Sequence, residues 1–124
     1  MESKAIMNSS RNGQIDYVEL PANDLTATRS FFETVFGWQF QDWGGEYVSF
    51  KDGTMNGGFY KAEGASRVER GGALIVLYHA DLEGIYEKVV AGGATIEKEI
   101  FSFPGGRRFH FLEPSGNEFA IWSE

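Results

Sequence analysis

The sequence repeats one pattern of helix caps, apolar faces and glycine stops. Asp24-Leu25 begins the helical part of the first copy, and Asp81-Leu82 begins that of the second, 57 residues further along. In each copy a strand-like segment precedes the helix and three short ones follow it. A two-layer α+β domain without internal symmetry is the alternative, but it leaves the paired caps unexplained. We therefore predict an α+β chain of two βαβββ units, at about residues 14–60 and 73–123, with a polar linker over 61–72.

The first unit is predicted from its alternation and its turn residues. Residues 15–20 alternate between apolar and polar side chains as a half-buried strand does, and Pro21 is expected to end that strand. Asp24 can cap a helix, because its carboxylate accepts the free N–H groups of the first turn. Apolar residues recur at helical spacing up to Gly37, which is expected to stop this helix. Glycine-bearing turns then separate three predicted strands, at residues 38–43, 46–50 and 55–60.

The second unit follows the same order. A strand is predicted at residues 73–78, and Asp81 is expected to cap the helix that comes after it. Gly92-Gly93 is expected to end that helix. Its inward positions are predicted to be Leu82, Ile85, Val89 and Val90. Three further strands are predicted, at residues 95–100, 107–112 and 117–122.

Composition excludes several classes of protein. The 124 residues suit one domain, predicted over 14–124 behind a flexible tail of residues 1–13. With 11 basic and 18 acidic side chains, the formal charge of −7 argues against a nucleic-acid partner. The chain has no cysteine, which excludes disulfides and thiolate chemistry. No apolar run reaches the roughly 20 residues of a membrane span, and residues 1–13 lack a signal-peptide core, so we expect a cytoplasmic protein without a membrane partner.

Two stretches of the chain resemble a known family. They are YVELPANDLTATRSFFETVFGW, residues 17–38, and RRFHFLEPSGNEFAIW, residues 107–122. The first resembles the opening strand and helix, and the second the closing strands and turn, of the vicinal oxygen chelate superfamily. That superfamily includes glyoxalase I, bleomycin-resistance proteins, fosfomycin-resistance enzymes and extradiol dioxygenases. The resemblance covers about residues 14–123. It implies an eight-stranded open barrel with helices on the convex side, ligands on the concave side, and a homodimer, in some members with exchanged units.

Metal-dependent members of that superfamily hold their metal through four side chains, usually His, Gln or Glu. The resemblance places these positions at Tyr17, within residues 53–60, at Leu74 and at Ala120. None of the three named residues is a credible ligand, and residues 53–60 contain no His, Gln, Asp or Glu. A divalent cation needs several nitrogen or carboxylate donors together. We therefore predict no metal site and no other cofactor.

Strand alternation predicts which side chains line the concave face. Apolar residues such as Val18 and Phe109 are expected to face the helices, so their neighbours along each strand point the other way. These neighbours combine aromatic rings with two carboxylates, one arginine and one histidine, which is typical of a small-molecule site. The predicted ligand-binding residues are Tyr17, Glu19, Tyr47, Ser49, Tyr78, Arg108, His110, Glu118 and Trp122.

His110 and Glu118 are the candidate catalytic groups. Histidine titrates near neutral pH, so a His110 that lines the pocket is the best available general base. The alternative is a hydrogen-bonded strand histidine with no role in chemistry. Glu118, like Glu19, either faces the pocket or is solvated at its rim.

The remaining polar and aromatic candidates have more than one reading. Arg108 can bind a substrate carboxylate in a two-pronged contact or pair with a glutamate. Trp122 is the better candidate for stacking on a ligand, because alternation turns it inward. Trp38 and Trp43 are expected to be packing residues.

Three functions remain open at this point. The first is a metal-independent protein of the bleomycin-resistance type that binds a small organic molecule. The second is a glyoxalase-like lyase or isomerase with an unusual site. The third is a non-catalytic regulatory or interaction module. Function follows the site and not the fold, so the resemblance does not choose among them.

Overall fold

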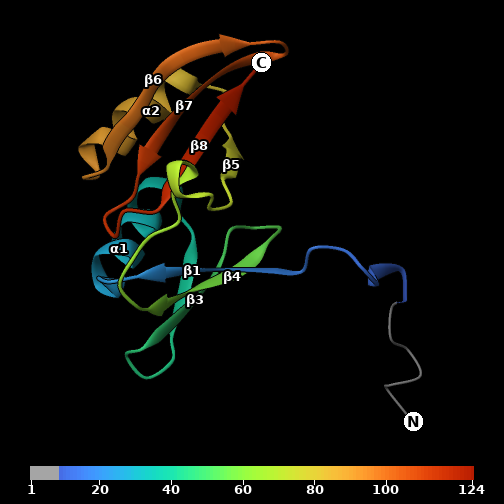
Figure 1. Cartoon of the computed structure of the whole chain (residues 1–124), viewed down its shortest axis with the longest axis vertical. Coiled ribbons are helices and arrows are strands. Elements are labelled where there is room, and N and C mark those ends of the chain that lie inside the picture. Colours follow the sequence, from blue (N-terminus) through green and yellow to red (C-terminus); the bar gives the residue numbers. More distant parts are fainter. Residues whose placement is uncertain (1–8) are drawn as a thin grey trace.

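The computed structural model describes residues 9–124, which contain two βαβββ units (Figure 1). The predicted tail of residues 1–13 lies mostly outside them, and its flexibility stays a prediction. Short 3-10 helices lie at Ser9–Arg11 and Val68–Arg70. The first unit consists of β1 (Tyr17–Ala22), α1 (Leu25–Phe36), β2 (Gln39–Asp42), β3 (Tyr47–Lys51) and β4 (Asn56–Lys61). The second consists of β5 (Ile75–Tyr78), α2 (Leu82–Ala91), β6 (Thr95–Phe103), β7 (Gly106–Leu112) and β8 (Glu118–Ser123).

Each unit forms its own four-stranded mixed sheet. We call the sheet ordered β1-β4-β3-β2 the first sheet and the sheet ordered β5-β8-β7-β6 the second sheet. In both, the strand before the helix pairs in parallel with the last strand of the unit, and the other pairings are antiparallel. The α+β class and the duplicated unit are therefore confirmed. The two sheets are not joined into a closed barrel within one chain.

The prediction that Pro21 ends the first strand is wrong. β1 continues to Ala22, and Pro21 pairs with Tyr60 in the parallel register. β1 is the edge strand of its sheet, so the N–H that proline lacks is not required by a second neighbour. β6 is also longer than predicted, because Phe103 still pairs with Gly106 across the turn.

The helix caps agree with the sequence prediction. Asp24 accepts a hydrogen bond from the Ala27 N–H at 3.0 Å, and Asp81 accepts one from the Gly84 N–H at 3.1 Å. Gly37 ends α1 in the left-handed conformation, with φ of 73°. The inward prediction for Val90 is wrong, since Val90 is 47% exposed. It follows the buried Val89 by one residue, a turn of about 100° that carries it away from the sheet.

An aromatic core joins the two units. Phe32 of α1 stacks on Trp38 at 4.4 Å between ring centroids and contacts Phe119 of β8 at 5.1 Å. Phe31 contacts Phe111 of β7 at 5.7 Å. Trp38 is therefore a packing residue, as predicted. Because the helix-facing sides of both sheets meet around this core, their opposite, concave faces remain available for other contacts.

A buried carboxylate also holds the units together. Glu113, in the turn before β8, is 2% exposed. One of its oxygens accepts a hydrogen bond from the Thr28 hydroxyl of α1 at 2.6 Å, and the other accepts one from the Asn117 amide at 2.7 Å. The same Asn117 amide donates to the Pro21 carbonyl of β1 at 2.7 Å. The turn between β7 and β8 is thus the polar junction between the units.

No helix among residues 9–124 is both long enough and apolar enough to cross a membrane.

Candidate functional site

The concave face of the first sheet carries a chain of hydroxyl groups that ends on a carboxylate. The Tyr47 hydroxyl donates to Glu19 Oε2 at 2.8 Å, and the Tyr17 and Tyr47 oxygens lie 2.6 Å apart. Since Tyr47 gives its proton to Glu19, Tyr17 is the donor to Tyr47. Burial, followed by these two hydrogen bonds, raises the pKa of Tyr47 above its ordinary value. The structure thus brings together three of the predicted site residues.

Gly58 makes this arrangement possible. It lies on β4, in register with Glu19 of β1 and Ser49 of β3. A Cβ atom on Gly58 would lie 2.0 Å from the Tyr47 hydroxyl oxygen. The absence of that atom lets Tyr47 cross β4 and reach β1. Gly58 lies within residues 53–60, the segment to which the resemblance assigns a metal ligand. The Tyr47 hydroxyl lies over Gly58, at a place where a side chain of β4 would otherwise project.

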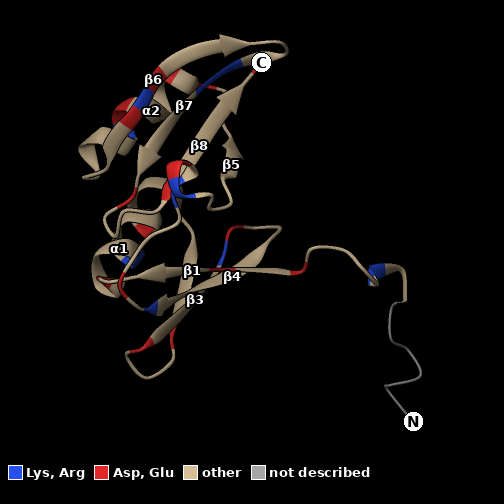
Figure 2. Cartoon of the chain, viewed as in Figure 1, with Lys and Arg blue, Asp and Glu red and all other residues tan. Residues whose placement is uncertain are grey.

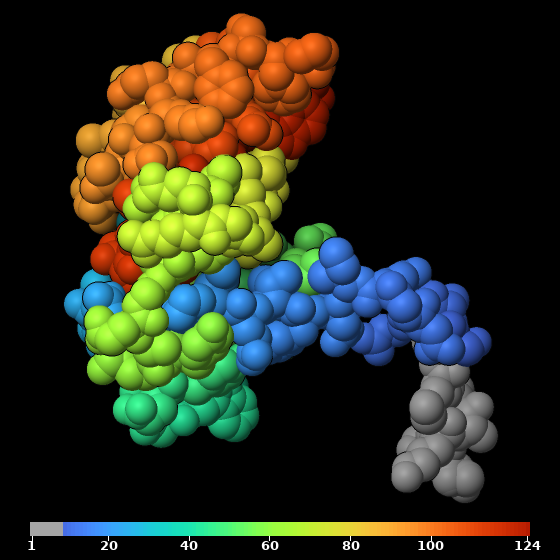
Figure 3. Space-filling view, in the orientation of Figure 1, coloured from blue at the N-terminus to red at the C-terminus, as the bar shows by residue number. Residues whose placement is uncertain are grey.

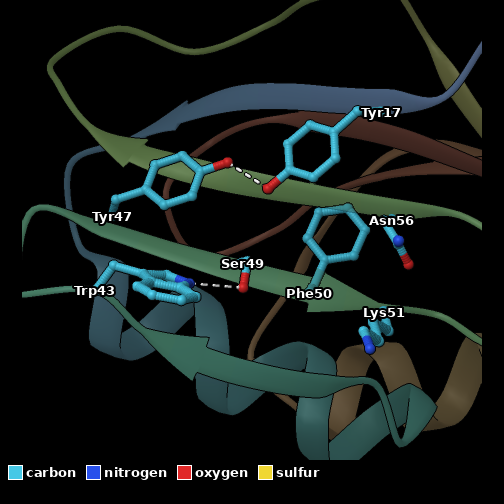
Figure 4. Close-up of a pocket in the computed structure, with 7 residues that line it drawn as sticks. All are labelled: Tyr17, Trp43, Tyr47, Ser49, Phe50, Lys51 and Asn56. Atoms are coloured by element: carbon cyan, nitrogen blue, oxygen red, sulfur yellow. Dashed lines mark hydrogen bonds between the residues drawn. The ribbon is translucent and has the colours of Figure 1, made fainter. Parts of the chain in front are cut away.

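A hollow of about 390 Å³ opens on this face (Figure 4). Trp43 belongs to its wall, which corrects the packing role expected for this residue. The Trp43 side chain is 58% exposed, and its indole N–H donates to the Ser49 hydroxyl at 2.9 Å. Alternation along residues 38–43 contains the signal for this position, because Trp43 lies an odd number of residues from Trp38, in the core, and from Phe40, which packs against the core. The full lining is Tyr17, Trp43, Tyr47, Ser49, Phe50, Lys51 and Asn56.

A row of four side chains crosses the concave face of the second sheet. The strand register places Tyr78 opposite Trp122, Trp122 opposite Arg108, and Arg108 opposite Phe101. Tyr78 and Trp122 meet edge to face at 5.2 Å between ring centroids. The Arg108 guanidinium lies 5.4 Å from the Phe101 ring centroid and 5.6 Å from that of Phe103. The predicted residues Tyr78, Arg108 and Trp122 therefore share one face.

His110 and Glu118 form a buried pair beside this row. They are 1% and 4% exposed, and His110 Nδ1 lies 2.8 Å from Glu118 Oε2. Burial opposes ionisation of Glu118, but hydrogen bonds from His110 and from the Val68 N–H hold its pKa below the ordinary value. The Glu118 carboxylate accepts a hydrogen bond from His110 Nδ1, so Nδ1 carries a ring proton. His110 Nε2 has no hydrogen-bond partner among the described residues. Glu118 is not solvated at a rim.

The linker supplies a residue that the sequence analysis missed. Arg67 lies against the second sheet, with Nε 3.5 Å from Glu118 Oε1 and a guanidinium nitrogen 3.1 Å from Glu97. The Ser66 carbonyl accepts from the Glu118 N–H at 2.8 Å, which fixes the segment to β8. Figure 3 shows this segment, in yellow-green, packed against the second unit. Neither glutamate pairs with Arg108, because Glu118 is bound by His110 and Arg67 and Glu19 accepts a hydrogen bond from Tyr47. The polar linker gives no sequence signal for the Arg67 contact.

Within the described part of the chain, no three His, Cys, Asp or Glu side chains gather closely enough to hold a metal ion. The residues at the positions implied by the resemblance do not fit one either. Tyr17 is bound to Tyr47, and Ala120 is fully buried on β8 and carries no donor atom.

The chain belongs to the Glyoxalase/Bleomycin resistance protein/Dioxygenase superfamily, whose sequence pattern matches residues 14–121. A glyoxylase-like domain-containing protein of Didymella fabae is 30% identical over 121 residues, which cover 89% of this chain and 93% of that protein. The protein CFP32 of Mycobacterium tuberculosis is 25% identical over 122 residues, 90% of this chain. The chain spans about half the length of that relative, 46%.

The fold also matches solved structures. The fosfomycin resistance protein FosX from Mesorhizobium loti superposes with a TM-score of 0.70 at 17% sequence identity. The match covers 91% of this chain and 92% of FosX. At this identity the likeness concerns the fold alone.

Proposed function

We propose that this protein binds a small organic molecule on its concave faces, without the metal site of its metal-dependent relatives. The hollow on the first sheet carries the proposal. Its rings, Tyr17, Trp43 and Tyr47, offer flat apolar surface, and the Ser49 hydroxyl and the tyrosine hydroxyls offer a few fixed polar contacts. A mostly apolar concavity with a small number of placed polar groups is typical of ligand sites.

We further propose that the protein works as a homodimer. Each sheet has two edge strands, and the linker segment is bound to the second sheet through the Glu118 N–H and the Ser66 carbonyl. Exposed edges and exposed rings such as Trp43 and Tyr78 are features that a second copy can cover. A symmetric dimer would place two identical concave surfaces against partner surfaces.

Binding is tested by screening planar aromatic compounds by thermal shift and titrating the hits by calorimetry. Trp43→Ala is expected to weaken a hit bound on the first sheet by about tenfold, the loss of one stacked ring, with little change in melting temperature. Trp122→Ala is expected to do the same to a hit bound on the second sheet. Val90→Ala, exposed on α2 away from both concave faces, is the control. Hits that bind both tryptophan variants as tightly as wild type would overturn the proposal. Unfolding of Trp122→Ala alone would show that Trp122 belongs to the core.

A glyoxalase-like lyase or isomerase is the second candidate, and the His110–Glu118 pair favours it. Glu118 orients the His110 ring through Nδ1, which leaves the buried Nε2 without a hydrogen-bond partner. In this candidate function the bound substrate reaches Nε2, which removes its proton. The test incubates protein with each hit and examines the recovered compound by mass spectrometry. An altered compound with wild type, and an unaltered one with His110→Gln, supports the enzyme. A compound recovered unchanged supports the binding protein.

A further inference from the structure

Arg108 has no acceptor for its charge. Its side chain forms no hydrogen bond and no ion pair with any residue between Ser9 and Glu124, although its Nε is buried. Its sequence neighbour Arg107 pairs with Glu83, and Arg67 contacts three carboxylates. The chain has more acidic than basic side chains, 18 against 11, yet none of the described ones pairs with Arg108. A half-buried cation without an acceptor is unfavourable. Arg108 is therefore placed where an acceptor from outside the chain can reach it.

The surroundings of Arg108 hold the guanidinium in place without neutralising it. Phe101 and Phe103 on β6 contact it through their ring faces, an interaction that orients a cation and leaves its N–H groups available. Trp122 lies directly across the strand pair, and Tyr78 lies beyond it. Figure 2 shows the basic stretch of β7 on a strand whose other visible parts are uncharged. The row thus consists of one open cation with aromatic rings on both sides.

Two other buried nitrogens lack a hydrogen-bond partner in the described part of the chain, and both lie on or over this sheet. They are His110 Nε2, two residues along β7 from Arg108, and Arg67 Nε, which lies 3.5 Å from Glu118. Buried polar atoms in folded proteins normally have partners, so this face is where the described residues leave polar groups without a hydrogen bond.

We propose that Arg108 recognises the carboxylate of an organic acid whose apolar, aromatic body lies on Trp122. A planar carboxylate matches the parallel N–H groups of a guanidinium in a two-pronged contact, and an aromatic body matches the neighbouring rings. This inference rests on the proposed binding on the concave faces and adds the chemical class of the ligand for the face of the second sheet. A phosphate ester offers the same negative charge with tetrahedral geometry, so the experiment includes one.

The experiment measures Trp fluorescence and calorimetric binding of four probes: 1-naphthoate, neutral 1-naphthamide, 1-naphthyl phosphate and inorganic phosphate. Wild type is expected to bind 1-naphthoate at least about tenfold more tightly than the amide. Arg108→Gln, which removes the charge and keeps similar bulk, is expected to bring the two affinities together. Arg107→Gln is the matched control, because Arg107 pairs with Glu83 on the other side of β7, and it is expected to keep the preference.

Each other outcome overturns the inference in a distinguishable way. If wild type binds 1-naphthoate and 1-naphthamide equally well, the protein binds aromatic molecules but Arg108 does not recognise a carboxylate. Tighter binding of the naphthyl phosphate, or binding of inorganic phosphate alone, replaces the organic acid by an oxyanion ester or an ion. Failure of all four probes, together with an empty screen of neutral aromatics, removes both proposals. A change in oligomer mass for Arg108→Gln without a change in probe binding assigns Arg108 to a contact between copies.

Discussion

Glu113 of the second unit accepts a hydrogen bond from the Thr28 hydroxyl of the first unit at 2.6 Å, in a site where both side chains are almost fully buried. The same carboxylate accepts the Ser115 and Asn117 backbone N–H groups. One carboxylate therefore holds its own turn and the opposite unit at once.

Removing this carboxylate is expected to destabilise the whole fold. Glu113→Gln places an amide NH2 among groups that are themselves donors, and a buried donor without an acceptor costs about 1–3 kcal/mol. Chemical denaturation at neutral pH measures the loss. Thr28→Val, which removes only the donor from α1, is expected to cost less. Unchanged midpoints for both variants would contradict the assignment of this turn as the junction.

Glu118 is expected to make the stability of the fold depend on pH in the acidic range. Its pKa is lowered in the folded protein, so its contribution is present above the ordinary glutamate pKa and is lost as the pH falls through the folded value. Melting temperatures of wild type are therefore expected to fall more steeply on acidification than those of Glu118→Gln. Parallel curves for the two proteins would show that the ionised carboxylate is not stabilised by His110 and Arg67.

Gly58→Ala is expected to break the tyrosine chain. The new methyl group would occupy the position of the Tyr47 hydroxyl and force that side chain off Glu19. The pKa of Tyr47, raised in the wild type, is then expected to return toward about 10, the ordinary tyrosine value. Ultraviolet titration of tyrosinate measures this shift, with Tyr47→Phe identifying the signal. A titration curve identical to that of wild type would contradict the packing of Tyr47 over β4.

Light scattering at micromolar concentration is expected to give about twice the 13.8 kDa mass of one chain. The open sheet edges and the exposed aromatic side chains of the concave faces motivate this expectation. A constant monomer mass over a wide concentration range would refute it.

Much of the fold could be predicted because its signals are local. Asp24, Asp81 and Gly37 act within one turn of chain, and the alternation that places Tyr17 and Glu19 on one face needs only the strand itself. The same local logic, carried one strand further, would have placed Trp43 on the concave face.

Other features depend on contacts between distant segments. Glu113 is buried because the second unit docks on α1, and a turn glutamate gives no hint of that docking. Arg67 lies in a segment with the polar composition of a solvent-exposed linker, yet it forms an ion pair with the buried Glu118. Pro21 predicts the end of a strand, but β1 continues to Ala22 because it lies at the edge of its sheet.

The most direct measurement titrates the tightest aromatic hit into protein kept in EDTA, with wild type and Trp43→Ala compared by calorimetry and the metal content measured in parallel. Metal-independent binding on the concave face predicts an affinity for wild type that EDTA does not change, weakened about tenfold by the tryptophan substitution. Loss of binding in EDTA, with about one equivalent of a transition metal per chain in untreated protein, would contradict it.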